Sequence, residues 1–365
     1  MQMENSKGNV MTVRGLIPAS EMGKTLTHEH LRYTVQFWGP EGGRTPEEEA
    51  FFNEKVSIEN LHRCRWNQLD NLDNCELYDS DVVVEELKYF TDAGGRTICD
   101  VSPEGLCKYD YARSLVDISK KTGVNIVGTV GYHIQSLHPE RVKSMTADEI
   151  AEEFLDVIRN GYRDYREAKP GIIGEMGTSE VIKEEEIKAL RGAARASVES
   201  GLALSIHTSL SERTGHQILD ILEDEGIDFS QVILDHVDAA ISQQDTTFDK
   251  GVDYIKSLAD RGCYVEFTCT GNSFRFVNTG GFWWLPTDLD RARAIKELCE
   301  RGHARRILIS HDGGHKSFLK KWGGWGYAHV LSGFKDTLLR VGLDERIIDS
   351  FSVDNPRRVL TIRTH

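Results

Sequence analysis

Short apolar runs rich in β-branched residues alternate with longer amphipathic stretches over most of the chain. Apolar residues at helical spacing predict helices, and the short runs predict buried strands. This alternation is typical of βα units around a parallel sheet, and the number of runs indicates a closed (β/α)8 barrel, an α/β fold. The predicted strands are 25–30, 97–101, 125–131, 171–175, 203–207, 232–236, 264–268 and 306–312. The predicted helices are 147–165, 184–199, 215–225, 248–261, 288–301 and 327–341.

Two segments depart from this alternation. Residues 31–93 are far more than an ordinary βα connection needs, and their length and charge predict a helical insertion after the first strand. Residues 11–21 predict a small strand pair, with Gly15 and Pro18 as turn residues. Neither segment needs a second domain, so we expect a single barrel domain over residues 1–365 with 31–93 as its insertion.

The composition of the chain argues against several classes of protein and of binding partner. The 365 residues are 39% hydrophobic and carry a net charge of −14. That charge argues against binding to nucleic acid or to an acidic membrane. The N-terminus lacks an apolar run and no stretch is apolar enough to span a membrane, so we expect a cytoplasmic protein. The seven cysteines include no Cys-x-x-Cys pair, which fits reduced thiols.

Residues able to bind a metal ion stand at or near the ends of several predicted strands. Successive side chains of a strand face opposite sides, so His28 and His30 share one face and Glu29 points away. The C-terminal ends of barrel strands meet at one rim, where catalytic groups gather. Nitrogen and oxygen ligands around a shared carboxylate suit Zn²⁺, with Mn²⁺ or Co²⁺ as alternatives. The candidate ligands are His28, His30, Glu175, His207, His236 and Asp312.

Each of these residues alone has an ordinary structural explanation. A single strand-end histidine is often a buried structural residue, and Asp312 could cap a turn. Independent structural reasons would not place all six on one barrel rim. The set therefore predicts two divalent metal ions and a metal-dependent hydrolase.

Longer motifs accompany these ligands. They are GKTLTHEHL at 23–31, GIIGEMG at 171–177, LISHD at 308–312, WGGWGY at 322–327 and DNPRR at 354–358. With them the chain resembles the phosphotriesterase family of the amidohydrolase superfamily, in particular its branch of phosphotriesterase-related proteins. The resemblance covers nearly the whole chain.

The resemblance implies a role for each ligand. His28, His30 and Asp312 would hold the more buried ion, His207 and His236 the more exposed one, and Glu175 would bridge both. Many members of the family use a carboxylated lysine on the fourth strand, whereas here Glu175 supplies a permanent carboxylate. Homodimers are common in the family, so we expect a homodimer.

The expected chemistry is attack by a metal-bridging hydroxide, with Asp312 accepting the proton and passing it to the leaving group. Ester-type bonds of lactones or phosphotriesters are the first substrate hypothesis. The alternative is an amide hydrolase acting on N-acyl amino acids or N-acyl taurine-like compounds, and a third is a binding barrel without catalysis, which the intact ligand set disfavours. The chain has no Gly-x-Ser-x-Gly motif, which argues against a serine hydrolase.

Candidate substrate contacts come from loops at the same rim. His133 follows the third strand and could touch substrate, contact the exposed metal or fill space. Trp283 and Trp284 lie in an aromatic loop after the seventh strand that could cover a small-molecule substrate, pack internally or form a subunit interface. His315, after the eighth strand, could meet an anionic substrate or be solvated.

Overall fold

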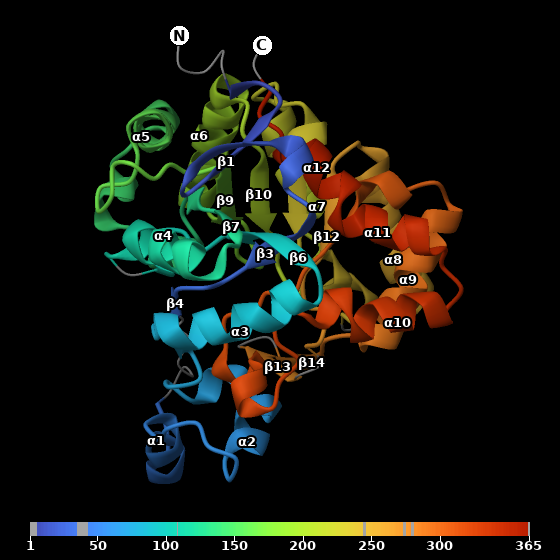
Figure 1. Ribbon diagram of the computed structural model, residues 1–365. Coiled ribbons are helices and arrows are strands. Elements are labelled where there is room, and N and C mark those ends of the chain that lie inside the picture. The colour runs from blue at the N-terminus through green and yellow to red at the C-terminus, as the bar shows by residue number, and fades with distance from the viewer. Residues whose placement is uncertain are drawn as a thin grey trace.

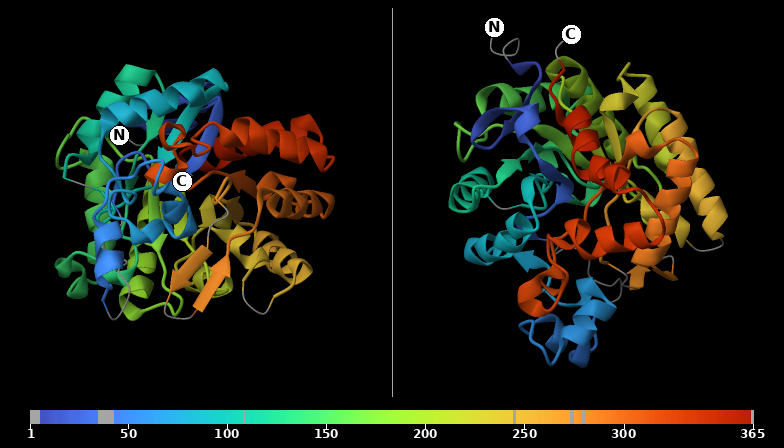
Figure 2. Two further views of the ribbon diagram at one scale, coloured as in Figure 1. Left: turned by 90° about the horizontal axis from the view of Figure 1, so that it is seen from below. Right: turned by 45° about the vertical axis from the view of Figure 1, so that its right-hand side comes forward.

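The computed structural model describes residues 6–34, 43–107, 109–243, 246–272, 275–278 and 281–363. Parallel strands form a ring that helices cover on the outside (Figure 1, Figure 2). One sheet has the order β3 (Lys24–Glu29), β6 (Gly95–Asp100), β7 (Asn125–Val127). The second runs from β8 (Thr129–Val130) through β9 (Ile172–Gly177), β10 (Leu204–His207), β11 (Val232–Asp235) and β12 (Tyr264–Phe267) to β15 (Ile307–Ile309). The predicted (β/α)8 barrel is confirmed.

The predicted third strand is broken into β7 and β8 at Gly128. A Cβ at this position would lie 2.6 Å from the Tyr162 hydroxyl and 3.1 Å from a methyl group of Val13. Only glycine fits so close an approach, and the strand bends where the two sheets meet.

Between β15 and β3 the ring of strands closes through other contacts than between the remaining strands. These strands lie side by side, but the described residues form no ladder between them. Instead the Ser310 hydroxyl oxygen accepts the backbone N–H of Thr27 at 2.9 Å and of His28 at 3.0 Å. The backbone N–H of Asp312 donates to the His28 carbonyl at 3.3 Å. We call this junction of β15 and β3 the seam.

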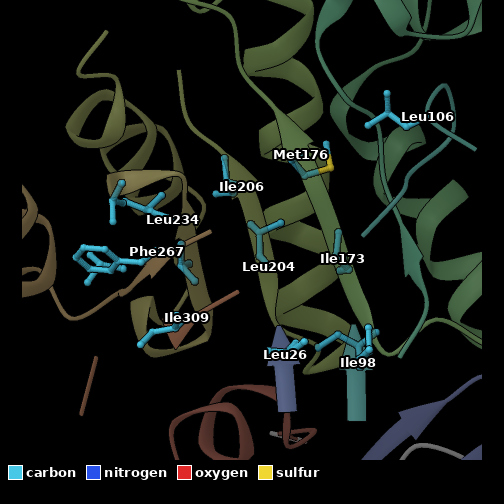
Figure 3. Packing of buried hydrophobic residues seen from close by; sticks show 14 of the residues in the cluster. Leu26, Ile98, Leu106, Ile173, Met176, Leu204, Ile206, Leu234, Phe267 and Ile309 are labelled. Carbon is cyan, nitrogen blue, oxygen red and sulfur yellow. The ribbon is translucent and has the colours of Figure 1, made fainter. Parts of the chain in front are cut away.

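Side chains alternate along the strands as the pleat requires. Leu204 and Ile206 of β10 point into the layer between strands and helices, with Leu234 and Phe267 from the neighbouring strands (Figure 3). Ser205 and His207 therefore face the barrel interior. The outer helices are α3 (Ser80–Asp92), α4 (Tyr111–Thr122), α5 (Ala147–Asn160), α6 (Glu184–Ser200), α7 (Gly215–Glu223), α8 (Phe248–Asp260) and α9 (Asp288–Glu300). They are followed by α10 (Gly333–Arg340), α11 (Glu345–Ser352) and α12 (Asp354–Leu360).

Two predicted helices end in other places. The helix predicted over 147–165 stops at Asn160, because Gly161 has φ 82° and a Cβ there would overlap the Arg166 carbonyl. The helix predicted over 327–341 is split into a 3₁₀ turn, His329–Leu331, and α10. Ser332 separates them with φ −129° and ψ −98°.

Additional elements gather at one end of the barrel. In the predicted insertion β4 (Tyr33–Thr34) pairs with β5 (Glu76–Leu77), and between them lie α1 (Pro46–Phe52) and α2 (Leu61–Trp66). The loop after β12 forms a hairpin of β13 (Arg275–Asn278) and β14 (Gly281–Trp284). Both groups lie in the lower half of Figure 1, opposite the strand pair β1 (Asn9–Thr12) and β2 (Gly15–Pro18). The sequence predicts such a pair over 11–21, but Gly15 and Pro18, predicted as turn residues, are the two ends of β2. None of the described helices is long and apolar enough to cross a membrane.

Candidate metal centre

β3 carries the first two predicted ligands. His30 Nε2 lies 3.0 Å from Asp312 Oδ1 and 3.4 Å from Glu175 Oε1. His28 Nε2 lies 3.7 Å from both Glu175 Oε2 and Asp312 Oδ1. Both rings face the barrel interior while Glu29 points to the seam. The His-x-His pair thus presents two nitrogens to the same pair of carboxylates.

Glu175 stands at the middle of the cluster. Its Oε2 lies 3.1 Å from His207 Nδ1 and 3.5 Å from His236 Nε2. The two imidazoles in turn meet at 2.8 Å between His207 Nδ1 and His236 Nε2. One carboxylate therefore faces the histidines of β3 and those that end β10 and follow β11.

Asp312 and His236 share an uncommon backbone conformation, with φ of 55° and 58°. Few residues other than glycine adopt positive φ, and those that do often lie at functional sites. At both places the strand has just ended. The turn at each position directs the side chain of Asp312 or His236 back over the end of the barrel.

The ligand atoms lie close enough to hold cations. They form overlapping groups in which the atoms lie within 4.8 Å of one another: His28, His30 and Asp312; His28, Glu175 and His236; and His133, Glu175 and His207. Both ring nitrogens of His28 are buried, and neither has a hydrogen-bond partner among the residues that the structure describes. A buried polar atom left so costs about 1–3 kcal/mol, which a bound cation would offset. The donors present therefore fit divalent ions such as Zn²⁺.

The charges of the cluster also favour a bound cation. Burial opposes the charged form of His28 and His30, but carboxylates outweigh it: Asp235 and Glu175 raise the pKa of His28, and Asp312 and Glu175 raise the pKa of His30 to about 9. Burial also opposes ionisation of Glu175, yet the surrounding histidines hold its pKa well below the ordinary value. The cluster is one of anionic oxygens that attract positive charge.

Polar groups behind the ligands orient the rings, and the sequence did not single them out. Ser102 Oγ lies 2.8 Å from His30 Nδ1, and the Thr268 hydroxyl contacts His236 Nδ1. Asp235 Oδ2 lies 3.4 Å from His28 Nδ1. Such partners set which ring nitrogen faces a metal. Asp235 had one sequence signal, a carboxylate inside an apolar strand next to His236.

His133 lies within the cluster of candidate metal ligands. Its Nε2 is 3.8 Å from Glu175 Oε1, and its ring centroid is 4.6 Å from that of His207. Its Nδ1 is buried and has no hydrogen-bond partner within the described part of the chain. Burial, then the neighbouring His207, lowers the pKa of His133 to about 3. The side chain is therefore neutral, with one nitrogen lone pair and one N–H to offer.

His315 and Tyr33 lie together at the edge of the cluster. The Tyr33 ring centroid is 4.4 Å from that of His30 and 5.7 Å from that of His315. His315 is half-buried, its Nε2 has no hydrogen-bond partner among the described residues, and burial lowers its pKa to about 4. Sequence reasoning missed Tyr33 because it follows the first strand in the insertion, where no pattern points to the centre.

The aromatic loop contributes a contact with the insertion. The Trp284 side chain is 45% exposed, and its ring meets that of Trp66 edge to face at 5.3 Å between centroids. The Trp283 side chain lies outside the described part of the structure. Cys269, which ends the strand-like run before this loop, lies in one potential ligand group with His236 and Asp312, although no sequence pattern assigns it a role.

Comparisons with known proteins match nearly the whole chain. The model of the phosphotriesterase family matches residues 8–360. An N-acetyltaurine hydrolase from Homo sapiens is 30% identical over 99% of this chain and 100% of its own length. A resiniferatoxin-binding protein from Rhodobacter sphaeroides has 37% identity and a TM-score of 0.90 over 98% of this chain and 97% of its own. A phosphotriesterase homology protein from Escherichia coli, solved with phosphate in its active site, has 27% identity and a TM-score of 0.74 over 93% of this chain and 99% of its own.

These matches agree with the cluster in pointing to catalysis, so the hypothesis of a binding barrel without chemistry is wrong. The chain belongs to the phosphotriesterase family, and it is a hydrolase.

Proposed function

We propose that this chain is a metal-dependent amide hydrolase that removes the acyl group from N-acyl taurines or related N-acyl amino acids. Six nitrogen and oxygen donors, all buried or half-buried, converge on one point. This observation supports a metal-dependent reaction. The full-length similarity to an N-acetyltaurine hydrolase supports an amide substrate over the lactones and phosphotriesters that the sequence favoured.

Two divalent ions would be held by the chain's own side chains. His28, His30 and Asp312 would bind one, His207 and His236 would bind the other, and Glu175 would be shared by both. Such a pair polarises a carbonyl group and lowers the pKa of water, which is the chemistry hydrolysis needs. The donor set favours Zn²⁺, and Mn²⁺ and Co²⁺ also fit.

Asp312 is the proton acceptor in this proposal. Its carboxylate is held 3.0 Å from His30 and is more exposed than the other carboxylate of the centre. Water attacks the acyl carbonyl carbon, its proton passes to an Asp312 oxygen, and that proton then goes to the amide nitrogen as the C–N bond breaks. An amine is a poor leaving group until it is protonated, so an amide substrate depends on this transfer more than an ester does.

The remaining candidate residues would contact substrate. The neutral His133 can donate one N–H toward the acyl carbonyl from beside Glu175. Trp284, with Trp66, offers an apolar wall at the rim, and Trp283 is proposed for the same wall. His315, at the edge of the cluster beside Tyr33, would contact the polar end of the amine.

Phosphoryl ester hydrolysis is the second candidate, because the similar protein from E. coli was solved with phosphate in its active site. Initial rates separate the two. Zinc-loaded protein is assayed on N-acetyltaurine, an N-acetyl amino acid, an unsubstituted γ-lactone and an aryl dialkyl phosphotriester. We expect kcat/KM to be highest for an N-acyl substrate and to vanish with chelator. Turnover of the lactone or triester alone would overturn the amide assignment.

A further inference from the structure

The ligands proposed for the more buried ion come from both sides of the seam. His28 lies in β3 and His30 directly follows it, whereas Asp312 follows β15. Because no ladder joins these strands among the described residues, the backbone bond from Asp312 to the His28 carbonyl is supplemented by side-chain hydrogen bonds across the seam. The residue between the two histidines, Glu29, makes several of them.

Glu29 is completely buried, and its carboxylate reaches across the seam. Oε1 accepts the backbone N–H of His311 at 3.0 Å and lies 2.6 Å from His311 Nδ1. Oε2 accepts the backbone N–H of Gly313 at 3.1 Å. These bonds hold the residues on either side of Asp312, whose own backbone N–H is bound to the His28 carbonyl at 3.3 Å.

The His311 ring completes the arrangement. The backbone N–H of Val330 donates to His311 Nε2 at 3.0 Å, so that nitrogen carries no proton. The ring proton is therefore on Nδ1, where it donates to Glu29. Glu29 accepts every one of these bonds and donates none. The Tyr327 hydroxyl adds contacts to the carbonyls of His30 at 2.9 Å and Gly313 at 3.0 Å.

We propose that Glu29 is a positioning residue: it fixes Asp312 against His28 and His30 across the seam and so sets the affinity of the buried half of the centre for its ion. This inference rests on the proposed function, because it assumes that these three residues bind metal. It assigns Glu29 no contact with substrate or ion. Partners that orient metal ligands typically change affinity or activity by about 10-fold to 100-fold when they are removed.

Glu86 of α3 offers a matched control. It is also a buried glutamate that accepts backbone N–H groups from the segment after β15, from Lys320 at 3.0 Å and Lys321 at 2.8 Å. These two residues flank no candidate ligand. Glu86→Gln therefore makes the same chemical change in a glutamate that holds the same segment, without touching the seam.

The experiment titrates chelator-stripped wild type, Glu29→Gln and Glu86→Gln with Zn²⁺ against a chromophoric competing chelator. In Glu29→Gln the new NH₂ group faces N–H donors, so one of the two Zn²⁺ sites is expected to weaken by about 10-fold to 100-fold while the other keeps its affinity. Glu86→Gln is expected to match wild type at both sites. Once loaded with excess Zn²⁺, Glu29→Gln should show reduced kcat with KM little changed.

Wild-type affinity at both sites of Glu29→Gln would overturn the positioning role, and so would equal weakening in Glu86→Gln. If Glu29→Gln fails to fold by circular dichroism, Glu29→Asp takes its place. That variant keeps the charge but has a shorter reach, and it should weaken the same single site; unchanged affinity would again overturn the inference. Wild type that binds no Zn²⁺ would instead overturn the proposed function, and this inference with it.

Discussion

The Asp312 side chain is more exposed to solvent than the side chains of its neighbours in the cluster. Its side chain is 31% exposed, whereas those of His28, His30 and Glu175 are 0%, 1% and 3% exposed. Burial opposes its ionisation, but His28 and His30 outweigh burial and hold the pKa of Asp312 far below its usual value. It is thus an ionised carboxylate that both contacts the centre and faces the open end of the barrel.

Replacing Asp312 by Asn should separate metal binding from proton transfer. The amide keeps one oxygen for the metal but cannot accept a proton, so kcat is expected to fall by about 100-fold to 10,000-fold. Zinc content should stay above half of the wild-type value. Full activity in Asp312→Asn would remove Asp312 from the mechanism.

Glu266 is a buried carboxylate that the mechanism does not use. Burial, then the neighbouring Asp235, raises its pKa from 4.5 to about 8, and it lies 2.6 Å from both the Thr27 and Ser310 hydroxyls. Between these two pH values the folded chain keeps a proton that the unfolded chain has lost. Stability from this group therefore falls as pH rises from about 4.5 to about 8.

Glu266→Gln should remove that loss, because its amide does not ionise. With zinc in excess, the free energy of unfolding of the variant relative to wild type should increase between pH 6 and pH 8.5, measured by denaturant titration. A difference independent of pH would mean that Glu266 is already ionised at pH 6.

At the scale of elements, the apolar pattern of the sequence predicts where the strands lie. It predicts less accurately where strands and helices end. Alternation along β10 and its neighbours predicts which residues face inward, and hence His207 and its companions at the rim. It could not predict the break at Gly128, which depends on how closely Tyr162 packs. Nor could it separate a 3₁₀ turn from an α-helix around Ser332, since both bury the same apolar residues. Tyr33 and Asp235 escaped prediction because barrel closure, rather than local sequence, brings them to the centre.

The hairpin β13–β14 and the insertion meet through Trp284 and Trp66. If this contact shapes the substrate wall, Trp284→Ala should raise KM for an N-acyl substrate by about fivefold and leave zinc content unchanged, since an apolar side chain is worth about 1–3 kcal/mol of binding. Tyr89→Ala on α3 removes a similarly exposed aromatic ring as a control. Equal KM values in wild type and Trp284→Ala would favour a packing role.

For the whole molecule, the proposed metal site predicts that metal binding and stability are linked across the seam. Ions held by residues from both sides would join the first and last strands of the barrel. Assembly into a homodimer stays a prediction, with a solution mass of twice the 41.2 kDa chain expected. The single-domain organisation also stays a prediction.

Removing metal should therefore lower the thermal midpoint. Two ions, each at 100 times its Kd, stabilise the folded state by about 5.4 kcal/mol, and about 1 kcal/mol shifts Tm by about 1–2 °C in a chain of 365 residues. We expect chelation to lower Tm by about 5–10 °C and added Zn²⁺ to restore it, with Ca²⁺ as the control ion. An unchanged Tm would separate metal binding from seam closure.

The central claim, a centre of two metal ions, is tested most directly by the metal content of purified protein prepared without chelator. Elemental analysis should find about two zinc-like ions per chain, and turnover of an N-acyl substrate should disappear with chelator and return with added metal. Protein that stays metal-free after reconstitution, or that hydrolyses its substrate equally well without metal, would contradict the account.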